Sequence, residues 1–115
     1  MKRQYRLRRN TDFQRVRREG KSNASPLMVL AFLRNKLDYS RFGFVVNKRL
    51  GKATQRNRIK RRMREATRLR TAQIKPGFDV IFIARQPINQ ASYGEIEQFL
   101  EKLLKDSELL ETGSK

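Results

Sequence analysis

Three residue types are missing from this sequence of 115 residues: cysteine, histidine and tryptophan. Without cysteine the chain forms no disulfide and has no thiolate nucleophile, and without histidine it has no imidazole for acid–base catalysis. A zinc finger, which draws on these two ligand types, is excluded as well. The chain also lacks any run of about 18 apolar residues, and no apolar segment follows its basic N-terminus. We therefore expect a cytoplasmic protein without a membrane partner.

Acidic residues are scarce. The chain has 11 Asp and Glu against 28 Lys and Arg, which gives a net charge of +17. Self-repulsion of this size is tolerated mainly when a polyanion neutralises it, so nucleic acid is the leading partner. The excess is uneven, because residues 1–75 carry a net +20 and residues 76–115 a net −3. We expect the partner to lie against the first two-thirds of the chain, with the C-terminal segment facing away.

The few acids of the basic part are scattered along it. Metal-dependent cleavage of a phosphodiester needs acids gathered around the metal ions, whereas residues 1–75 hold only Asp12, Glu19, Asp38 and Glu65. We therefore predict no catalytic residue and no metal ligand, which disfavours an autonomous nuclease. A ribosomal or other structural RNA-binding protein shares this size and charge and stays open as an alternative.

The apolar pattern predicts one α+β domain over residues 1–115, with the ends, 1–5 and 107–115, frayed. Strands are expected in three apolar or alternating runs, at 27–33, 41–49 and 78–84. In the second run, alternation separates a core set from a half-exposed set; the two sets are Phe42, Phe44 and Val46, and Gly43, Val45 and Asn47.

Three helices are expected, in NTDFQRVRREG, TQRNRIKRRMREATRLR and SYGEIEQFLEKLLKDSELL. The first is predicted to be capped by Asn10 or Thr11. The second is predicted to begin at Thr54 as its N-cap and to continue to the KPG sequence. In the third, Ser92 and Glu95 have capping-box spacing. Its apolar face, which is expected to cover a sheet, consists of five residues at helical period: Ile96, Phe99, Leu100, Leu103 and Leu104.

The middle helix, residues 54–70, carries eight cations and one acid. On a helical wheel its apolar side chains fall together, which predicts a buried stripe of Ile59, Met63 and Ala66. Nearly opposite lies a polar column of Asn57, Arg61, Arg64 and Arg68. A solvated face would mix signs to gain pairs of about 0.2–0.5 kcal/mol each, yet only Glu65 is available, to Arg61 and Arg62. A surface for a polyanion is therefore favoured over a solvated face or a disordered tail.

Seven of these eight cations are arginine. The planar guanidinium takes two phosphate oxygens at once or lies flat on a base, which the point charge of lysine does not. Phosphate contacts supply affinity without reading sequence, and each one steepens the salt dependence of binding. Asn57 either stiffens the start of the helix or contacts a ribose, a base edge or a hydrated metal ion, and the sequence leaves these alternatives open.

Within this helix, RNRIKRRMRE (Arg56–Glu65) resembles the RNR signature of the bacterial ribonuclease P protein family. It follows VNKRLGKA, which is similar to the family's approach from strand to helix. Other segments agree with the family in order and spacing: RLRRNTDFQRVRREG near the start, the apolar run 27–33, VIFIARQP at 80–87 and the amphipathic last helix. The resemblance covers nearly the whole chain and is more specific than any basic run.

The resemblance implies a fold and a role. The fold is a small single-domain α/β sandwich of αβββαβα order, in which the basic helix lies in a left-handed βαβ crossover and KSNAS supplies a short strand. The role is that of a protein subunit: a catalytic RNA hydrolyses the phosphodiester that releases the 5′ leader of precursor tRNA, using Mg²⁺ held mainly by the RNA and the substrate. The implied partners are ribonuclease P RNA and precursor tRNA, and the protein alone is expected to be monomeric.

The resemblance also implies two sets of binding residues. The RNR helix would bind the catalytic RNA through Arg56, Asn57, Arg58, Lys60, Arg61, Arg62, Arg64 and Arg68. A cleft would bind the leader through Phe13, Val29, Val45, Asn47, Lys48, Lys60 and Arg64. Phe13 and Val29 also fit a plain packing role. Ala31 and Arg17 stand where relatives often carry aromatic residues, so the cleft is expected to depend more on charge than on base stacking.

Overall fold

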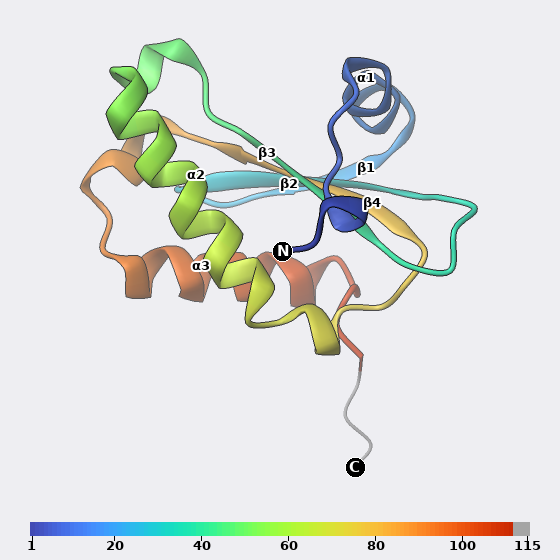
Figure 1. Cartoon of the computed structure of the whole chain (residues 1–115). Coiled ribbons are helices and arrows are strands. Elements are labelled where there is room, and N and C mark those ends of the chain that lie inside the picture. Colours follow the sequence, from blue (N-terminus) through green and yellow to red (C-terminus); the bar gives the residue numbers. More distant parts are fainter. Residues whose placement is uncertain (112–115) are drawn as a thin grey trace.

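The computed structural model describes residues 1–111. Its helices and strands are, in chain order, α1 (Asn10–Glu19), β1 (Lys21–Ala24), β2 (Met28–Arg34), β3 (Arg41–Val45), α2 (Ala53–Arg68), β4 (Phe78–Ala84) and α3 (Tyr93–Asp106). The predicted αβββαβα order is therefore confirmed, including the short strand in KSNAS. Figure 1 shows the three helices arranged around one central sheet.

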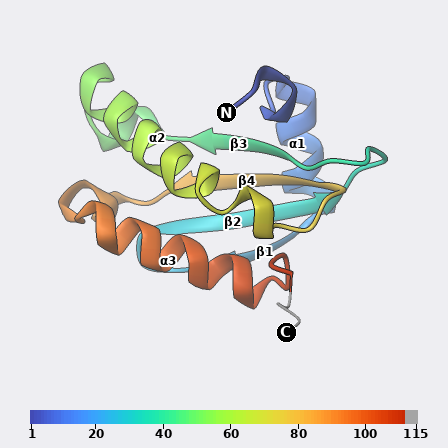
Figure 2. The same cartoon turned by 60° about the horizontal axis from the view of Figure 1, so that its bottom comes forward.

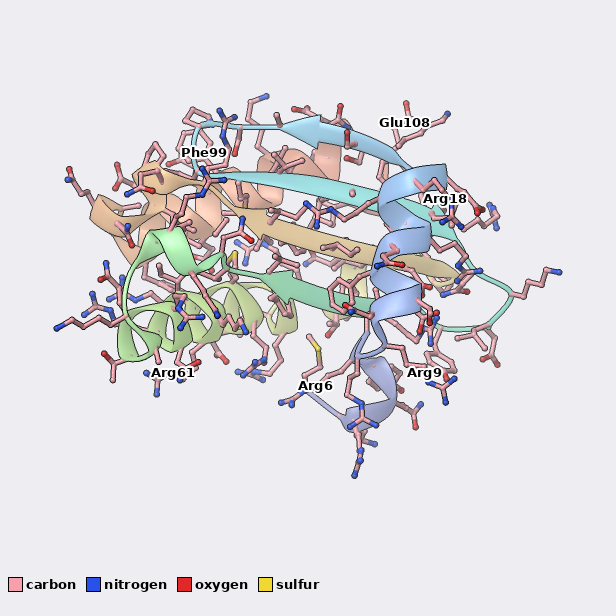
Figure 3. All side chains as sticks on the ribbon, turned by 90° about the horizontal axis from the view of Figure 1, so that it is seen from above. Arg6, Arg9, Arg18, Arg61, Phe99 and Glu108 are labelled. Atoms are coloured by element: carbon pink, nitrogen blue, oxygen red, sulfur yellow. The ribbon has the colours of Figure 1, made fainter. Side chains whose placement is uncertain are left out.

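The sheet has the strand order β1-β2-β4-β3. The pairs β1–β2 and β2–β4 are antiparallel, whereas β3 and β4 are parallel and are joined by α2. Seen from the α1 side, α2 lies beyond the sheet and the chain passes from β3 to β4 in the left-handed sense (Figure 3). The predicted left-handed crossover that contains the basic helix is confirmed.

The two faces of the sheet are covered differently. Helices α2 and α3 lie side by side on one face, and α1 lies on the other (Figures 1 and 2). Alternation along the strands sends Leu30 and Phe82 into the large core under α2 and α3, and sends Ala31 and Ile81 into a smaller cluster under α1. The α1 face is therefore covered by one helix, whereas the opposite face is covered by two.

The predicted apolar faces of the two large helices are confirmed. Ile59, Met63 and Ala66 of α2 are all buried in the main core. So are four of the five predicted residues of α3, with Phe99 half-buried beside them; the four are Ile96, Leu100, Leu103 and Leu104. Both helices are thus fixed by burial of an apolar stripe, which leaves the opposite side of α2 free to carry charge.

The cap of α3 is as predicted. The Ser92 hydroxyl accepts from the Glu95 N–H at 3.1 Å, and the Glu95 carboxylate accepts from the Ser92 N–H at 2.9 Å. The cap predictions for the other two helices are wrong. α1 begins one residue after Arg9, whose carbonyl already accepts from two helical N–H groups, and neither Asn10 nor Thr11 caps it.

The bounds of α2 also differ from the prediction. The helix begins at Ala53, directly after its N-cap residue Lys52, so Thr54 lies inside the helix and is not its N-cap. Gly51, with φ of 135°, turns the chain directly before this point, which a residue with a side chain rarely does. At the other end α2 stops at Arg68 and a short 3-10 turn follows at Thr71–Gln73, so the helix does not continue to the KPG sequence.

Residues at both ends of the described chain have defined contacts. Arg3–Tyr5 forms a 3-10 turn, and Arg6 bridges to Phe42 at the edge of β3. Leu109 is buried, and Leu110 bridges to Ile74. The expected fraying of 1–5 and 107–115 concerns motion and stays a prediction; residues 112–115 lie outside the described part of the chain.

Candidate nucleic-acid interface

The exposed side of α2 carries the predicted binding residues in three different states. Asn57, Arg58 and Arg61 are exposed. Lys60, Arg62 and Arg64 are half-buried, and so is Arg56, whose guanidinium donates to the Gly51 carbonyl at 3.0 Å and thus braces the start of the helix. Arg68 is exposed but donates twice to Glu65, at 3.0 and 2.6 Å.

The ion pair between Arg68 and Glu65 differs from the pairing that the sequence predicted. Glu65 was assigned to Arg61 or Arg62, one turn before it, whereas the structure pairs it with Arg68, one turn after it. Both directions bring side chains together on a helix surface, and the wheel does not distinguish them. In the described part of the chain the ion pairs of α2 involve only Arg68, so Arg61 and Arg62 keep an uncompensated charge.

A hollow of about 630 Å³ lies along this side of α2, and we call it the arginine hollow. It is lined by Met1, Arg6, Arg58, Arg61, Arg62, Arg64, Glu65, Arg68 and Tyr93. Burial and the charges of Arg6 and Arg61 lower the pKa of Arg64 below its ordinary value. Cations crowded in this way repel one another, and a bound anion would relieve that repulsion.

Arg6 was not among the predicted site residues. It lies 47 positions before the first residue of α2, and the bridge from the N-terminal segment to Phe42 of β3 brings it beside the helix. A local signal existed, since RLRRN is a basic run, but only the pairing of this segment with β3 shows which basic residues join the helix. Figure 3 shows Arg6, Arg9 and Arg61 on the β3 side of the molecule, with Glu108 toward β1.

A second, smaller hollow lies at the edge of β3, between α1 and α2. Its volume is about 180 Å³, and we call it the edge hollow; its lining is Arg6, Leu7, Arg8, Phe13, Phe42, Gly43, Phe44, Lys60 and Arg64. Three predicted leader residues, Phe13, Lys60 and Arg64, therefore meet here from two helices. Arg64 lines both hollows, which makes the basic surface continuous from one to the other.

The Phe13 ring can pack against β3 in the edge hollow because Gly43 has no side chain. A Cβ atom at Gly43 would lie 2.5 Å from two ring carbons of Phe13, closer than real Cβ contacts allow. The ring is half-buried, so it both packs on β3 and keeps an open side. The two roles that the sequence left open for Phe13 are therefore compatible.

The remaining predicted leader residues extend away from Phe13 along the α1 face. Val29 pairs with Ile83, and Ile83 pairs with Val45 across three neighbouring strands. All three side chains are half-buried, and we call this row the cleft floor. Ile83 was missed in the sequence because VIFIA reads as a uniformly buried strand.

Beyond the cleft floor the chain places Asn47 and Lys48, both exposed. Asn47 lines a hollow of about 450 Å³ together with Arg49 and Arg85, at the carboxyl ends of β3 and β4. The predicted leader set therefore forms a track along one face, from Phe13 to Lys48, and does not form a single pocket. The two sets predicted along the second strand lie on opposite faces, with Phe42, Phe44 and Val46 in the main core and Val45 on the α1 face. Gly43 of the half-exposed set is buried against the Phe13 ring, and β3 ends at Val45 and not at Arg49.

Ala31 and Arg17, the two positions where relatives often carry aromatic residues, differ in burial. Ala31 is 4% exposed and packs in the cluster under α1 with Val16 and Ile81, so it supports the helix and does not form part of the open cleft floor. Arg17 is exposed on α1. The expectation that this cleft depends more on charge than on stacking stays a prediction.

A buried acid that the sequence did not single out holds α1 in place. Asp79 of β4 has no exposed side-chain surface and accepts from Arg41 at 2.9 and 2.7 Å, from Arg15 of α1 at 3.1 Å and from Asn35 at 3.0 Å. The hydrogen bond with Asp79 raises the pKa of Arg41 above its ordinary value. A lone Asp in an apolar strand gives no hint of its partners, which come from three other segments.

Residues 1–111 contain neither a cluster of metal-binding side chains nor a membrane-spanning helix. No group of three or more Asp and Glu side chains is placed to hold a metal ion. No helix there is long and apolar enough to cross a lipid bilayer.

The sequence of this chain matches one protein family along nearly its whole length. A protein-family model described as Ribonuclease P matches residues 1–108. The chain belongs to this family. A ribonuclease P protein component from Herpetosiphon aurantiacus is 46% identical over 109 residues, which cover 95% of this chain and 89% of that protein. One from Alkaliphilus oremlandii is 41% identical over 108 residues, covering 94% and 95%.

Solved ribonuclease P proteins have the same fold. The Staphylococcus aureus protein superposes with a TM-score of 0.87 at 38% identity, over 92% of this chain and 97% of that one. The Thermotoga maritima protein gives 0.82 at 38% identity, over 88% and 96%. The predicted family and fold class are confirmed. Membership in the ribonuclease P family places the chain in tRNA processing, in partnership with an RNA subunit, and sets aside a ribosomal protein.

Proposed function

We propose that the chain binds the catalytic RNA of ribonuclease P through α2 and the 5′ leader of precursor tRNA along the α1 face. The observation that carries this proposal is the continuity of the basic surface. Arg64 lines both the arginine hollow and the edge hollow, so one helix presents cations to two sides. One side would serve the RNA subunit, and the other would serve the substrate.

Docking on the catalytic RNA would use the uncompensated cations of α2. Arg58 and Arg61 are exposed, and Arg62 is half-buried on the wall of the arginine hollow. Their planar forks suit pairs of phosphate oxygens. Burial and the charges of Arg6 and Arg61 lower the pKa of Arg64, and RNA phosphates would relieve the repulsion among these cations.

The leader would lie as an extended single strand over the cleft floor. Lys60 and Arg64 stand at one end of this track and Lys48 at the other, in places suited to phosphates. The half-exposed side chains of Phe13 and Val45 offer apolar contact to bases without a hydrogen-bond code. Such a track would hold leaders of many sequences, because phosphate and stacking contacts do not read bases.

Under this proposal the chain supplies binding and orientation, and the RNA subunit supplies the chemistry. Mg²⁺, held mainly by the RNA and the substrate, would activate the attacking water and stabilise the leaving oxygen. The residues of α2 and the cleft would fix the leader beside the cleavage site and lower the repulsion between two RNA strands. We place this work in the cytoplasm, where precursor tRNA is processed, and propose that the protein is monomeric without RNA.

Reconstitution tests the proposal. Precursor tRNA cleavage by the RNA subunit is measured against magnesium concentration, with and without the protein, and the protein is also assayed alone. We expect no cleavage by the protein alone and a lower magnesium requirement when it is added to the RNA. Cleavage at the mature 5′ end by the protein alone, or an unchanged magnesium requirement, would contradict the proposal.

A further inference from the structure

A further hollow, of about 420 Å³, lies where the N-terminal segment crosses the start of β3, and we call it the aromatic hollow. It is lined by Met1, Lys2, Tyr5, Asp38, Tyr39, Ser40, Phe42, Arg68, Thr71, Ala72, Ile74 and Pro76. None of the residues predicted for the leader cleft lines it. Of the residues predicted for RNA docking, only Arg68 does.

The walls of the aromatic hollow are apolar rings and side chains. Tyr5 and Tyr39 meet edge to face, with ring centroids 5.5 Å apart and planes at 78°. Phe42 and Ile74 are buried behind them. The Ser40 hydroxyl is already engaged, since it donates to the Lys75 carbonyl at 2.7 Å and accepts from the Phe78 N–H at 3.0 Å. What the hollow offers a ligand is therefore mainly aromatic and aliphatic surface.

Cations flank this apolar surface on both sides. On one side the aromatic hollow shares Met1 and Arg68 with the arginine hollow. On the other, Tyr39 also lines a hollow of about 520 Å³, whose remaining lining is Arg3, Gln4, Arg6, Arg8, Arg9, Asp12 and Arg41. An apolar site between two basic sites suits a nucleotide chain, in which each base lies between two phosphates.

We infer that the aromatic hollow receives one unstacked nucleobase of the RNA that binds α2. The inference rests on the proposed docking of the catalytic RNA and adds a base contact to a surface otherwise suited to phosphates. Single-stranded RNA is commonly held by stacking unpaired bases on Tyr or Phe, with Arg and Lys along the backbone. An apolar side chain of a protein partner would fill the hollow but would leave the cations on both sides without counter-charge.

The position of the hollow assigns the base to the catalytic RNA and not to the leader. Phe42 and Ile74, at its base, belong to the main core on the α2 side of the sheet, whereas the cleft floor lies on the α1 side. One acid lines the hollow, Asp38, which is exposed and makes no hydrogen bond or ion pair within residues 1–111. A carboxylate accepts from an exocyclic amino group, which adenine and cytosine carry and uracil lacks.

The first experiment measures ligand binding by the intact wild-type protein with nuclear magnetic resonance. AMP, UMP and ribose 5-phosphate are added separately at equal millimolar concentrations. AMP is expected to shift the ring signals of Tyr5 and Tyr39 more than UMP does, and ribose 5-phosphate, which has no base, should leave them in place. The inference fails if AMP does not shift these rings, or if ribose 5-phosphate shifts them as much.

The second experiment measures affinity for the catalytic RNA across a range of salt concentrations. Tyr39→Leu is expected to weaken binding by about five- to a hundredfold, from the usual effect of losing one stacked base, with an unchanged log-salt slope. Tyr39→Phe should retain most of the affinity because it keeps the ring. Phe99→Leu, the same loss of a ring from α3, is the control and should bind like wild type.

The outcomes separate this inference from the proposed function. If the wild-type protein binds the RNA with a steep salt dependence but Tyr39→Leu binds equally well, the base site is wrong and the docking helix stands. If the wild-type protein shows no salt-dependent binding, the proposed function itself fails. Thermal unfolding of each variant checks that it is folded, and the nucleotide experiment needs no variant at all.

Discussion

At the scale of single residues, two positions set where α1 lies and therefore how the α1 face is shaped. Asp79 anchors α1 through Arg15 and ties it to β3 through Arg41. Gly43 lets the Phe13 ring settle on β3. Neither residue is proposed to bind RNA. Both fix the position of Phe13, which is proposed to contact the leader. Each can be tested with a conservative change.

Asp79→Asn should lower the free energy of unfolding by about 3 kcal/mol. Removing one partner of a buried ion pair usually costs about 3–5 kcal/mol, and the lower value applies because Arg15 and Arg41 retain some contact with water. Urea unfolding measures the change. Asp106→Asn, which breaks the exposed pair with Lys102, is the matched control, with an expected loss below about 1 kcal/mol. Similar losses in the two variants would show that Asp79 is not an anchor.

Gly43→Ala should weaken the binding of precursor tRNA with a leader and leave that of mature tRNA unchanged in the reconstituted enzyme. The added methyl group would overlap the Phe13 ring and force it, or α1, to move, at a cost of about 1–3 kcal/mol in stability. Gly94→Ala on α3 is the control, because its nearest contact is an ordinary 3.8 Å. An equal effect on both RNAs would remove Phe13 from the leader track.

At the scale of elements, α2 performs two tasks with two sides of one helix. Its apolar stripe is buried in the core, and its other side carries cations that only one acid on the helix balances. The left-handed crossover places this helix beside the edge strand β3, next to the N-terminal segment. This placement is what gives α2 a basic neighbour in Arg6.

Replacing Arg61, Arg64 and Arg68 together with Gln should weaken binding of the catalytic RNA and flatten its log-salt slope by up to about three units. Each lost phosphate contact lowers the slope by nearly one. The control variant replaces three exposed lysines away from α2, which are Lys21, Lys102 and Lys105. We expect the control to change the slope by less than one unit; equal slopes in the wild-type and arginine variants would place the arginine column outside the interface.

At the scale of the whole molecule, a net charge of +17 on 115 residues opposes compaction. The cations gather on the N-terminal segment, α1 and α2, and the acids gather on α3, where Glu97 and Glu101 pair with Arg70 at the end of the basic stretch. We expected the C-terminal segment to face away from the basic surface. Helix α3 instead lies beside α2, next to that surface. It neutralises one end of that surface and leaves the rest charged.

A polyvalent anion should stabilise the free protein more than salt alone. Pyrophosphate at ten times its dissociation constant should add about 1.4 kcal/mol, which raises Tm by roughly 5 °C for a domain of this size. Thermal unfolding in sodium chloride at matched ionic strength separates this binding from general screening. Equal increases in the two salts would mean that the arginine hollow holds no anion in particular.

Side-chain patterns alone predicted the three helices, three of the four strands, the buried stripe of α2 and the capping box of α3. These follow from contacts within a few residues, where the spacing of side chains is set by the helix or strand itself. The resemblance of RNRIKRRMRE added the family and the left-handed crossover. The caps of α1 and α2 were misjudged because the turn before each helix depends on the backbone around it, as at Gly51.

Which distant residues meet becomes visible in the folded chain alone. Folding brought Arg6 beside Arg64, joined Val29, Ile83 and Val45 into one floor, and gathered partners from three segments around Asp79. It also set Tyr5 against Tyr39 between two basic hollows. Such contacts depend on strand order and register, and local side-chain spacing does not encode these, because many pairings of the same strands would satisfy the same apolar pattern.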